Sequence, residues 1–197
     1  MHTDKEVREA LHRSVLIEHR RDGNTLVLNE LGLRHGTCRA DIVVVNGFLH
    51  GFEIKSDVDT LDRLPQQIMV YNEVFDRVTL VVGEKHHGRA LDMIPHWWGV
   101  KIASKHDLKV DFLHHRRPTL NTDLNPVAVA ELLWRPEAVG ILRGLGIEEK
   151  RLRFPRSHLY SLLTELVDLP ELRRLVRETL KGRPGWRGQR PPLLGGS

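Results

Sequence analysis

The chain has 197 residues, of which 40% are apolar and 28% are charged, and this composition excludes a disordered or a fibrous protein. No apolar run reaches the roughly 20 residues that span a bilayer, and the single cysteine excludes an internal disulfide. We therefore expect a cytoplasmic protein that has neither a leader segment nor a membrane partner.

The formal net charge of +4 is spread unevenly along the chain. Residues 1–149 contain 19 Lys and Arg against 22 Asp and Glu, whereas residues 150–190 contain 11 against 4. A basic C-terminal part favours an acidic partner, of which nucleic acid is the commonest. A basic surface that contacts only solvent is the alternative.

Residues 1–117 carry the patterns of one α/β domain. Apolar residues three and four apart predict an amphipathic helix over 4–20. The elements that follow are strands over 25–33, 39–45 and 48–56, a helix over 64–75, a strand over 77–83, a helix over 86–94, and strands over 100–104 and 108–114. Three successive strands followed by helical crossovers predict a mixed central β-sheet with helices on both faces.

From residue 118 onward the patterns become helical and basic. Proline and capping residues predict four short helices, over 126–134, 136–144, 157–167 and 170–181. This extension, residues 118–182, is either a relative of the helix-turn-helix or a plain helical cap. The Gly- and Pro-rich residues 183–197 predict a disordered tail.

Three charged residues stand inside the predicted hairpin of residues 39–56. Asp41 opens its first strand, and Glu53 and Lys55 flank Ile54 in its second. Residues two apart in a strand share a face, so Glu53 and Lys55 project together. Two carboxylates on neighbouring strands offer the hard oxygen ligands that Mg²⁺ or Mn²⁺ prefers. With a lysine beside them, they predict metal-assisted hydrolysis of a phosphodiester.

Asp41, eleven intervening residues and then Glu53-Ile54-Lys55 resemble the signature of the PD-(D/E)xK nucleases. Archaeal Holliday-junction resolvases, many restriction endonucleases and RecB-type nucleases share this signature, and the resemblance covers residues 4–104. It implies a restriction-endonuclease-like αβββαβ core and an endonuclease or exonuclease similar to small bacterial members. The proline expected before the first aspartate is absent, and Arg39-Ala40 stands there instead.

A second match lies on the helix that follows. Gln67 and Tyr71 are four residues apart and share a helix face, and they resemble the Q-x-x-x-Y motif of RecB-like nucleases. In that resemblance, both residues position Lys55 or the substrate, and Lys55 acts on the attacking water. The alternative places Tyr71 in the core and Gln67 on the surface.

The resemblance also implies the metal ligands, Asp41 and Glu53. A third carboxylate often completes such a site. Glu9 and Glu18 on the first helix are available, but Glu30 lies inside an apolar strand, where an unpaired carboxylate is costly. We therefore favour Glu30 as the assisting ligand.

The expected partner is nucleic acid, DNA in preference to RNA, and a homodimer is left open. The residues expected to contact it are Arg39, Arg151, Arg153 and Arg156. Two alternatives to an independent nuclease remain. One is a non-catalytic nucleic-acid-binding module, and the other is a partner-dependent nuclease subunit of a defence or mobile-element system.

The hairpin register tests the metal site. Asn46-Gly47 favours a two-residue turn, which pairs Asp41 with Phe52 and therefore points Asp41 away from Glu53. One extra residue corrects this, either as a bulge at Gly51 or as a three-residue loop that includes Phe48.

Overall fold

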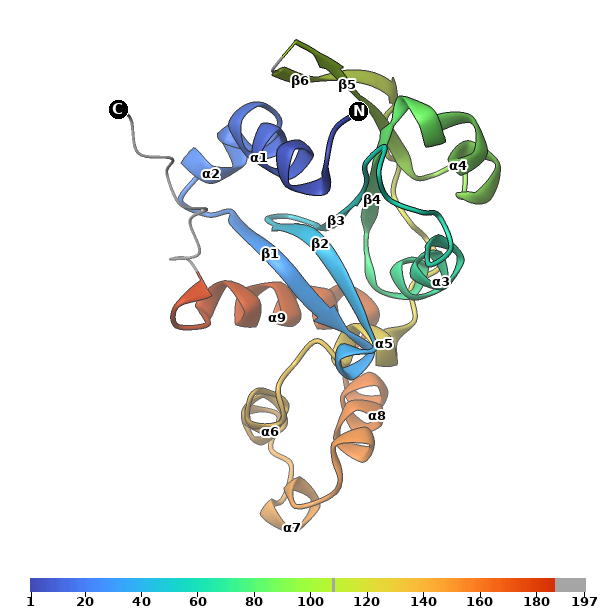
Figure 1. Ribbon diagram of the computed structural model, residues 1–197. Helices are drawn as coiled ribbons and strands as arrows, with labels where there is room; N and C mark the ends of the chain where they lie inside the picture. The colour runs from blue at the N-terminus through green and yellow to red at the C-terminus, as the bar shows by residue number, and fades with distance from the viewer. Residues whose placement is uncertain (108, 187–197) are drawn as a thin grey trace.

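The computed structural model describes residues 1–107 and 109–186 (Figure 1). Its centre is a six-stranded sheet in which the strands lie in chain order. They are β1 (Leu26–Leu33), β2 (Cys38–Val45), β3 (Leu49–Lys55), β4 (Arg77–Gly83), β5 (Gly99–His106) and β6 (Lys109–Arg116). The pairs β1–β2, β2–β3 and β5–β6 are antiparallel, whereas β3–β4 and β4–β5 are parallel. The predicted mixed α/β sheet is confirmed.

Helices cover both faces of the sheet (Figure 1). One face packs against α1 (Asp4–Ser14), which a capping box of Thr3 and Glu6 begins. The short α2 (Ile17–Arg21) follows, so the single helix predicted over 4–20 is broken. Leu16 lies between the two helices in the sequence, has φ −98° and ψ 2°, and is fully buried. The crossover helices α3 (Leu64–Val74) and α4 (His87–Met93) contribute to the core of the other face. Short 3₁₀ turns precede β2 and α4, at Arg34–Gly36 and Glu84–His86.

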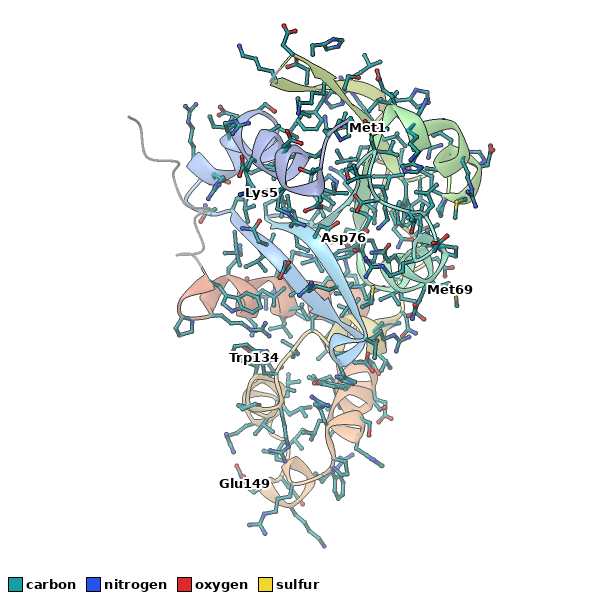
Figure 2. The ribbon with its side chains drawn as sticks, in the orientation of Figure 1. Met1, Lys5, Met69, Asp76, Trp134 and Glu149 are labelled. Carbon is teal, nitrogen blue, oxygen red and sulfur yellow. The ribbon has the colours of Figure 1, made fainter. Side chains whose placement is uncertain are left out.

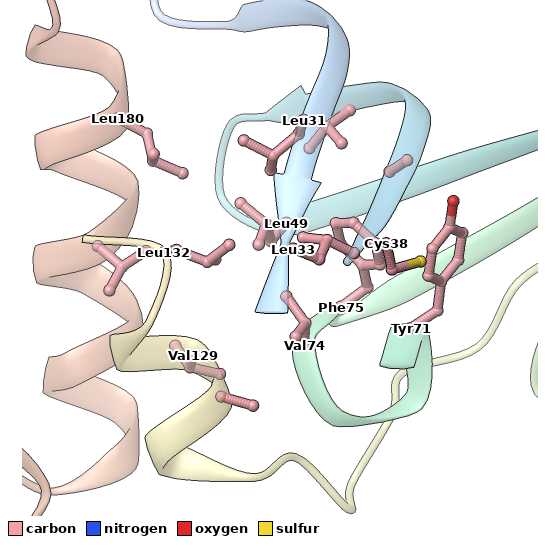
Figure 3. Close-up of a cluster of buried hydrophobic side chains, with 14 of the residues drawn as sticks. Leu31, Leu33, Cys38, Leu49, Tyr71, Val74, Phe75, Val129, Leu132 and Leu180 are labelled. Carbon is pink, nitrogen blue, oxygen red and sulfur yellow. The ribbon is translucent and has the colours of Figure 1, made fainter. Parts of the chain in front are cut away.

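The helical extension shares the core of the sheet. Its helices are α5 (Pro126–Ala130), α6 (Arg135–Gly144), α7 (Glu149–Leu152), α8 (Arg156–Leu166) and α9 (Leu169–Gly182). Side chains of α9 and α5, such as Leu180 and Val129, belong to the same buried cluster as Leu33 and Leu49 of the sheet (Figure 3). In contrast, α6, α7 and α8 extend away from the sheet (Figure 1).

The prediction of a disordered tail over residues 183–197 is wrong at its start, because residue 183 is part of the folded structure. Arg183 is buried, with its guanidinium between the rings of Trp134 and Trp186, and it is paired with Glu137. The remaining tail residues, 187–197, lie outside the described residues. No helix in the described parts of the chain is both long and apolar enough to cross a membrane.

The β2–β3 hairpin has the three-residue loop Asn46-Gly47-Phe48, because Val45 pairs with Leu49. The same register places Asp41 opposite Glu53, one position beyond the last bonded pair. The alternative of a bulge at Gly51 is wrong, since Gly51 keeps regular register with both neighbouring strands.

Gly51 is required for a different reason, the close approach of Phe75. A Cβ atom at Gly51 would lie 2.8 Å from two atoms of the Phe75 ring, which belongs to the core. We expect Gly51→Ala to lower the free energy of unfolding by about 1–3 kcal/mol, the usual cost of overpacking. Urea denaturation measures this change. Gly47→Ala in the same hairpin is the control, because its Cβ would meet nothing within 4 Å; equal losses in the two variants would contradict the explanation.

Candidate functional site

One pocket of about 500 Å³ lies where β2 and β3 separate beside α1, and the predicted site residues that line it are Glu30, Arg39, Asp41, Glu53, Lys55 and Gln67. Among the described residues, its lining contains five carboxylates and four cationic side chains. They are Asp4, Glu30, Asp41, Glu53 and Asp59, and Arg8, Arg39, Lys55 and Arg63. We call this hollow the acidic pocket.

Glu53 is the most deeply placed of these carboxylates, with 1% of its surface exposed. Its Oε1 accepts hydrogen bonds from Lys55 Nζ and from Gln67 Nε2, both at 2.6 Å. Its Oε2 accepts one from the Tyr71 hydroxyl at 2.5 Å. The structure therefore brings Glu53, Lys55, Gln67 and Tyr71 together, as the sequence predicts. Ile54, between the two charged residues of β3, points into the core on the opposite face.

The position of α3 decides this arrangement. Pro65 stands in its first turn, where the missing N–H costs nothing. Gln67 and Tyr71 are four positions apart on the helix, so both face β3. The Tyr71 ring is fully buried and stacks on Trp98, while its hydroxyl reaches Glu53. The sequence left open whether Tyr71 lies in the core or belongs to the site. In the structure it does both, since its ring is buried and its hydroxyl donates to Glu53.

Asp41 is held from two sides. Its Oδ2 accepts a hydrogen bond from the backbone N–H of Ile54 at 2.8 Å, and its Oδ1 accepts one from the Arg8 guanidinium at 3.0 Å. Arg8 also donates to the Asp41 backbone carbonyl at 2.7 Å and forms an ion pair with Asp4. The Asp41 carboxylate therefore satisfies a backbone donor of β3 beyond the end of the bonded ladder.

Burial, and then repulsion from Asp41, raise the pKa of Glu53 from 4.5 to about 7. The hydrogen-bonded ammonium of Lys55 opposes this rise. Burial also raises the pKa of Asp4, to which Asp41 and Asp59 add repulsion. Burial and the nearby Glu53 carboxylate raise the pKa of Tyr71, so its hydroxyl keeps the proton that it donates. The acidic pocket thus crowds negative charge around a carboxyl that titrates near neutrality.

Glu30 lies at the mouth of the acidic pocket rather than beside Glu53. Its φ of 62° is unusual for a residue other than glycine, and its half-exposed side chain forms an ion pair with Arg39 at 3.2 Å. Across residues 1–107 and 109–186, no three His, Cys, Asp or Glu side chains are grouped so that they could hold a metal ion. The structure therefore brings together Asp41 and Glu53 of the three predicted ligands.

The predicted nucleic-acid contacts are spread over a longer surface. Arg39 stands at the mouth of the acidic pocket with 65% of its side chain exposed. Arg156 lines a second hollow of about 530 Å³, which shares Glu30 and Gly36 with the acidic pocket. We call this second hollow the Trp134 hollow, after the half-exposed ring at the start of α6 (Figure 2).

Arg151 and Arg153 are exposed and line neither hollow. Arg151 lies in α7, as does Glu149, which Figure 2 shows at the far end of the helical extension. The sequence alone did not indicate Arg8 and Arg63. The local signal for Arg8 is Asp4, one helical turn earlier, and nothing in the sequence indicates that α1 reaches Asp41 in the middle of β2.

The family described as "Bacteriophage P4 protein cII" matches residues 3–187 of the chain. A curated relative, "Protein cII" of Enterobacteria phage P4, is 28% identical over 157 residues. The matched region covers 80% of this chain and 59% of that relative, so the chain spans less than two thirds of the relative's length. No solved structure matches the chain. The restriction-endonuclease-like character of the core therefore stays a prediction.

These matches overturn the prediction of a PD-(D/E)xK nuclease, because the family they indicate covers nearly the whole chain. The predicted phosphodiester hydrolysis is wrong with it, and the matches give the two alternatives no specific support. The physical reason is that charges in a D-x(n)-E-x-K spacing can satisfy one another. Here Arg8 and the Ile54 N–H hold Asp41, while Lys55 and α3 hold Glu53.

The raised pKa of Glu53 gives a pH dependence with a definite sign. A carboxyl whose pKa is higher in the folded protein stabilises it fully below pH 4.5, and this contribution is lost as the pH rises through about 7. We expect the free energy of unfolding to fall across this window by up to ~3 kcal/mol relative to Glu53→Gln. Urea denaturation at a series of pH values measures the difference. Glu165→Gln, which changes an exposed carboxylate of α8, should follow the wild type; parallel profiles for wild type and Glu53→Gln would contradict the burial argument.

Proposed function

The chain belongs to the bacteriophage P4 protein cII family, and we propose that its acidic pocket binds nucleic acid through a divalent cation, Mg²⁺ or Mn²⁺. DNA is the preferred partner and the cytoplasm the proposed location. The proposal concerns binding and assigns no reaction to the pocket. The observation that carries it is the buried Glu53 carboxyl, which has a raised pKa and lies near a second carboxylate, that of Asp41.

The residues of the acidic pocket fit a small divalent cation. Asp41 and Glu53 supply carboxylate oxygens, which Mg²⁺ and Mn²⁺ prefer. Burial raises the pKa of Glu53 most, and a cation between the two carboxylates would relieve the repulsion from Asp41 that adds to this rise. The buried Oε1 of Gln67 has no hydrogen-bond partner among the described residues, and it lies on the same wall of the pocket. It is an acceptor suited to a water molecule on the cation.

Each remaining predicted residue has a definite part in the proposal. Lys55 and Tyr71 orient Glu53 by donating to different oxygens, and Gln67 fixes Oε1. Glu30 is held in its ion pair with Arg39, so it joins the cation only if that pair opens. The bound cation supplies the positive charge that attracts a phosphate oxygen, and waters complete its coordination.

The surface beside the acidic pocket supports a nucleic-acid strand. Arg39 at the mouth and Arg156 in the Trp134 hollow are exposed guanidinium groups, which suit phosphate. The two hollows share Glu30 and Gly36, so a strand passes from one to the other without leaving the surface. The exposed ring of Trp134 is a platform on which a base can stack. Arg151 and Arg153 then serve only a longer strand that reaches α7.

The cation site predicts a saturable heat of Mn²⁺ or Mg²⁺ binding by isothermal titration calorimetry. Asp41→Asn removes a carboxylate charge at nearly constant shape, and we expect it to weaken binding at least about tenfold, roughly 1.4 kcal/mol. Asp92→Asn, which changes an exposed carboxylate in α4, is the control with the same change of charge. Thermal unfolding of all three proteins separates lost binding from lost folding. Equal affinities in wild type and Asp41→Asn would contradict the site.

The nucleic-acid proposal predicts that Mg²⁺ strengthens binding of a labelled DNA strand, measured by fluorescence anisotropy. Added Mg²⁺ ordinarily weakens such binding by competing for the phosphates, so strengthening is diagnostic of a bridging cation. Arg156→Ala is expected to weaken binding and to lower the slope of log K against log salt by about 1.

Arg89→Ala, an exposed arginine of α4 outside both hollows, controls for the change of net charge. An RNA strand of the same sequence tests the preference for DNA. Binding that weakens with Mg²⁺ in the wild type as it does in Asp41→Asn would overturn the bridging role. Equal losses in Arg156→Ala and Arg89→Ala would overturn the proposed path along the surface.

A further inference from the structure

A third hollow, of about 560 Å³, lies on the side of the sheet that packs against α1. Its floor is the sheet itself, with His50 and Phe52 from β3, Thr79 from β4, Lys101 from β5 and His114 from β6. The end of α1 and His19 of α2 form its wall. None of its lining residues lines the acidic pocket, so it is a separate site. We call it the Lys101 hollow.

Lys101 is the unusual residue of this hollow, because it is a buried ammonium with 5% of its surface exposed. Its Nζ contacts both ring nitrogens of His114, with Nδ1 at 3.1 Å and Nε2 closer still. Within the described residues, no carboxylate forms an ion pair with Lys101, although Asp111 lines the same hollow. Buried charges in proteins are normally paired, so this ammonium calls for an anion.

Cationic side chains lie near both histidines of the hollow. Burial lowers the pKa of His50 to about 3, and the cationic neighbours Arg77, His19 and Lys101 add to this shift. Burial lowers the pKa of His114 as well, and Lys101 and Arg117 act in the same direction. Burial lowers the pKa of Lys101, and among the described residues no carboxylate opposes it.

The hollow also has an aromatic side. The His50 ring stacks on Phe52 with 4.3 Å between ring centroids, and its Nε2 lies 2.9 Å from the Thr79 hydroxyl oxygen, which fixes its orientation. Phe112 from β6 completes this side. A volume of this size falls within the roughly 300–1,000 Å³ of small-molecule sites. A charged corner beside flat rings is suited to a ligand that joins a phosphoryl group to a planar heterocycle.

We propose that the Lys101 hollow binds a mononucleotide, with its phosphoryl group at Lys101 and His114 and its base against His50, Phe52 and Phe112. The nucleotide is either free or the 5′-terminal residue of a nucleic-acid strand, since both present the same chemistry. The proposal does not depend on the acidic pocket or on a divalent cation.

Calorimetric titration of the full chain tests the site, with adenosine 5′-monophosphate and inorganic phosphate as probes. We expect the nucleotide to bind at least tenfold more tightly than phosphate. Lys101→Met keeps the apolar stem and removes the charge, and removing an uncompensated buried charge is compatible with folding. It is expected to weaken nucleotide binding at least tenfold. Lys109→Met, an exposed lysine of β6, is the control with the same change of charge and should bind as the wild type does.

His114→Ala is the second variant, which keeps the test decisive if Lys101→Met does not fold, and the same direction of loss is expected. Equal affinity for nucleotide and phosphate would overturn the nucleotide assignment. Unchanged binding in Lys101→Met or, if that variant does not fold, in His114→Ala would overturn the site, as would no binding by the wild type.

A 5′-phosphorylated oligonucleotide and its unphosphorylated twin, compared in EDTA, identify the source of the phosphoryl group. Tighter binding of the phosphorylated strand assigns the hollow to a strand end. Equal binding of the two strands, with adenosine 5′-monophosphate still bound, assigns it to a free nucleotide. EDTA removes the divalent cations that the proposed role of the acidic pocket needs and that the Lys101 hollow does not need. If the acidic pocket fails, binding to the Lys101 hollow in EDTA is unchanged. If the Lys101 hollow fails, that binding is absent.

Discussion

The burial of one carboxylate, that of Glu53 in the third strand, constrains the rest of this structure. An ionised or protonated carboxyl that lost its partners at 1% exposure would cost several kcal/mol. Its two oxygens instead receive three donors, from Lys55, Gln67 and Tyr71. Two of these come from α3, so the position of that helix along β3 is set by a polar network as well as by the packing of the Tyr71 ring on Trp98.

The same constraint explains why β2 and β3 separate where they do. The bonded ladder ends at Ile42 and Phe52, and the Asp41 carboxylate then takes the Ile54 N–H. Arg8 neutralises this carboxylate from α1 and thereby ties the first helix to the sheet. Charges that resemble a nuclease signature in the sequence thus form two hydrogen-bonded clusters on neighbouring strands, one around Asp41 and one around Glu53. These partners are sufficient to account for the placement of the charges, which is why the spacing alone indicated the wrong family.

The sequence predicted the features that depend on local periodicity, namely the mixed sheet, the shared strand face of Glu53 and Lys55, and the shared helix face of Gln67 and Tyr71. It left the hairpin register open, because Asn46-Gly47 favours a two-residue turn, whereas the predicted site required either a bulge at Gly51 or a three-residue loop. It could not predict that Phe75 packs on Gly51, that α1 delivers Arg8, or that Lys101 is buried against His114. Each of these is a contact between distant segments, on which local pattern carries no information.

The register of this hairpin decides two sites at once. Alternate residues of a strand face opposite sides, so β3 presents Glu53 and Lys55 to the acidic pocket and His50 and Phe52 to the Lys101 hollow. A shift of β3 by one residue would exchange the two sets and place the carboxylate among the cations of the other face. The three-residue loop prevents this shift, and the close contact of Gly51 with the Phe75 ring opposes it independently. The acidic pocket and the Lys101 hollow can therefore receive alternate residues of one strand because a short loop and a glycine fix its register.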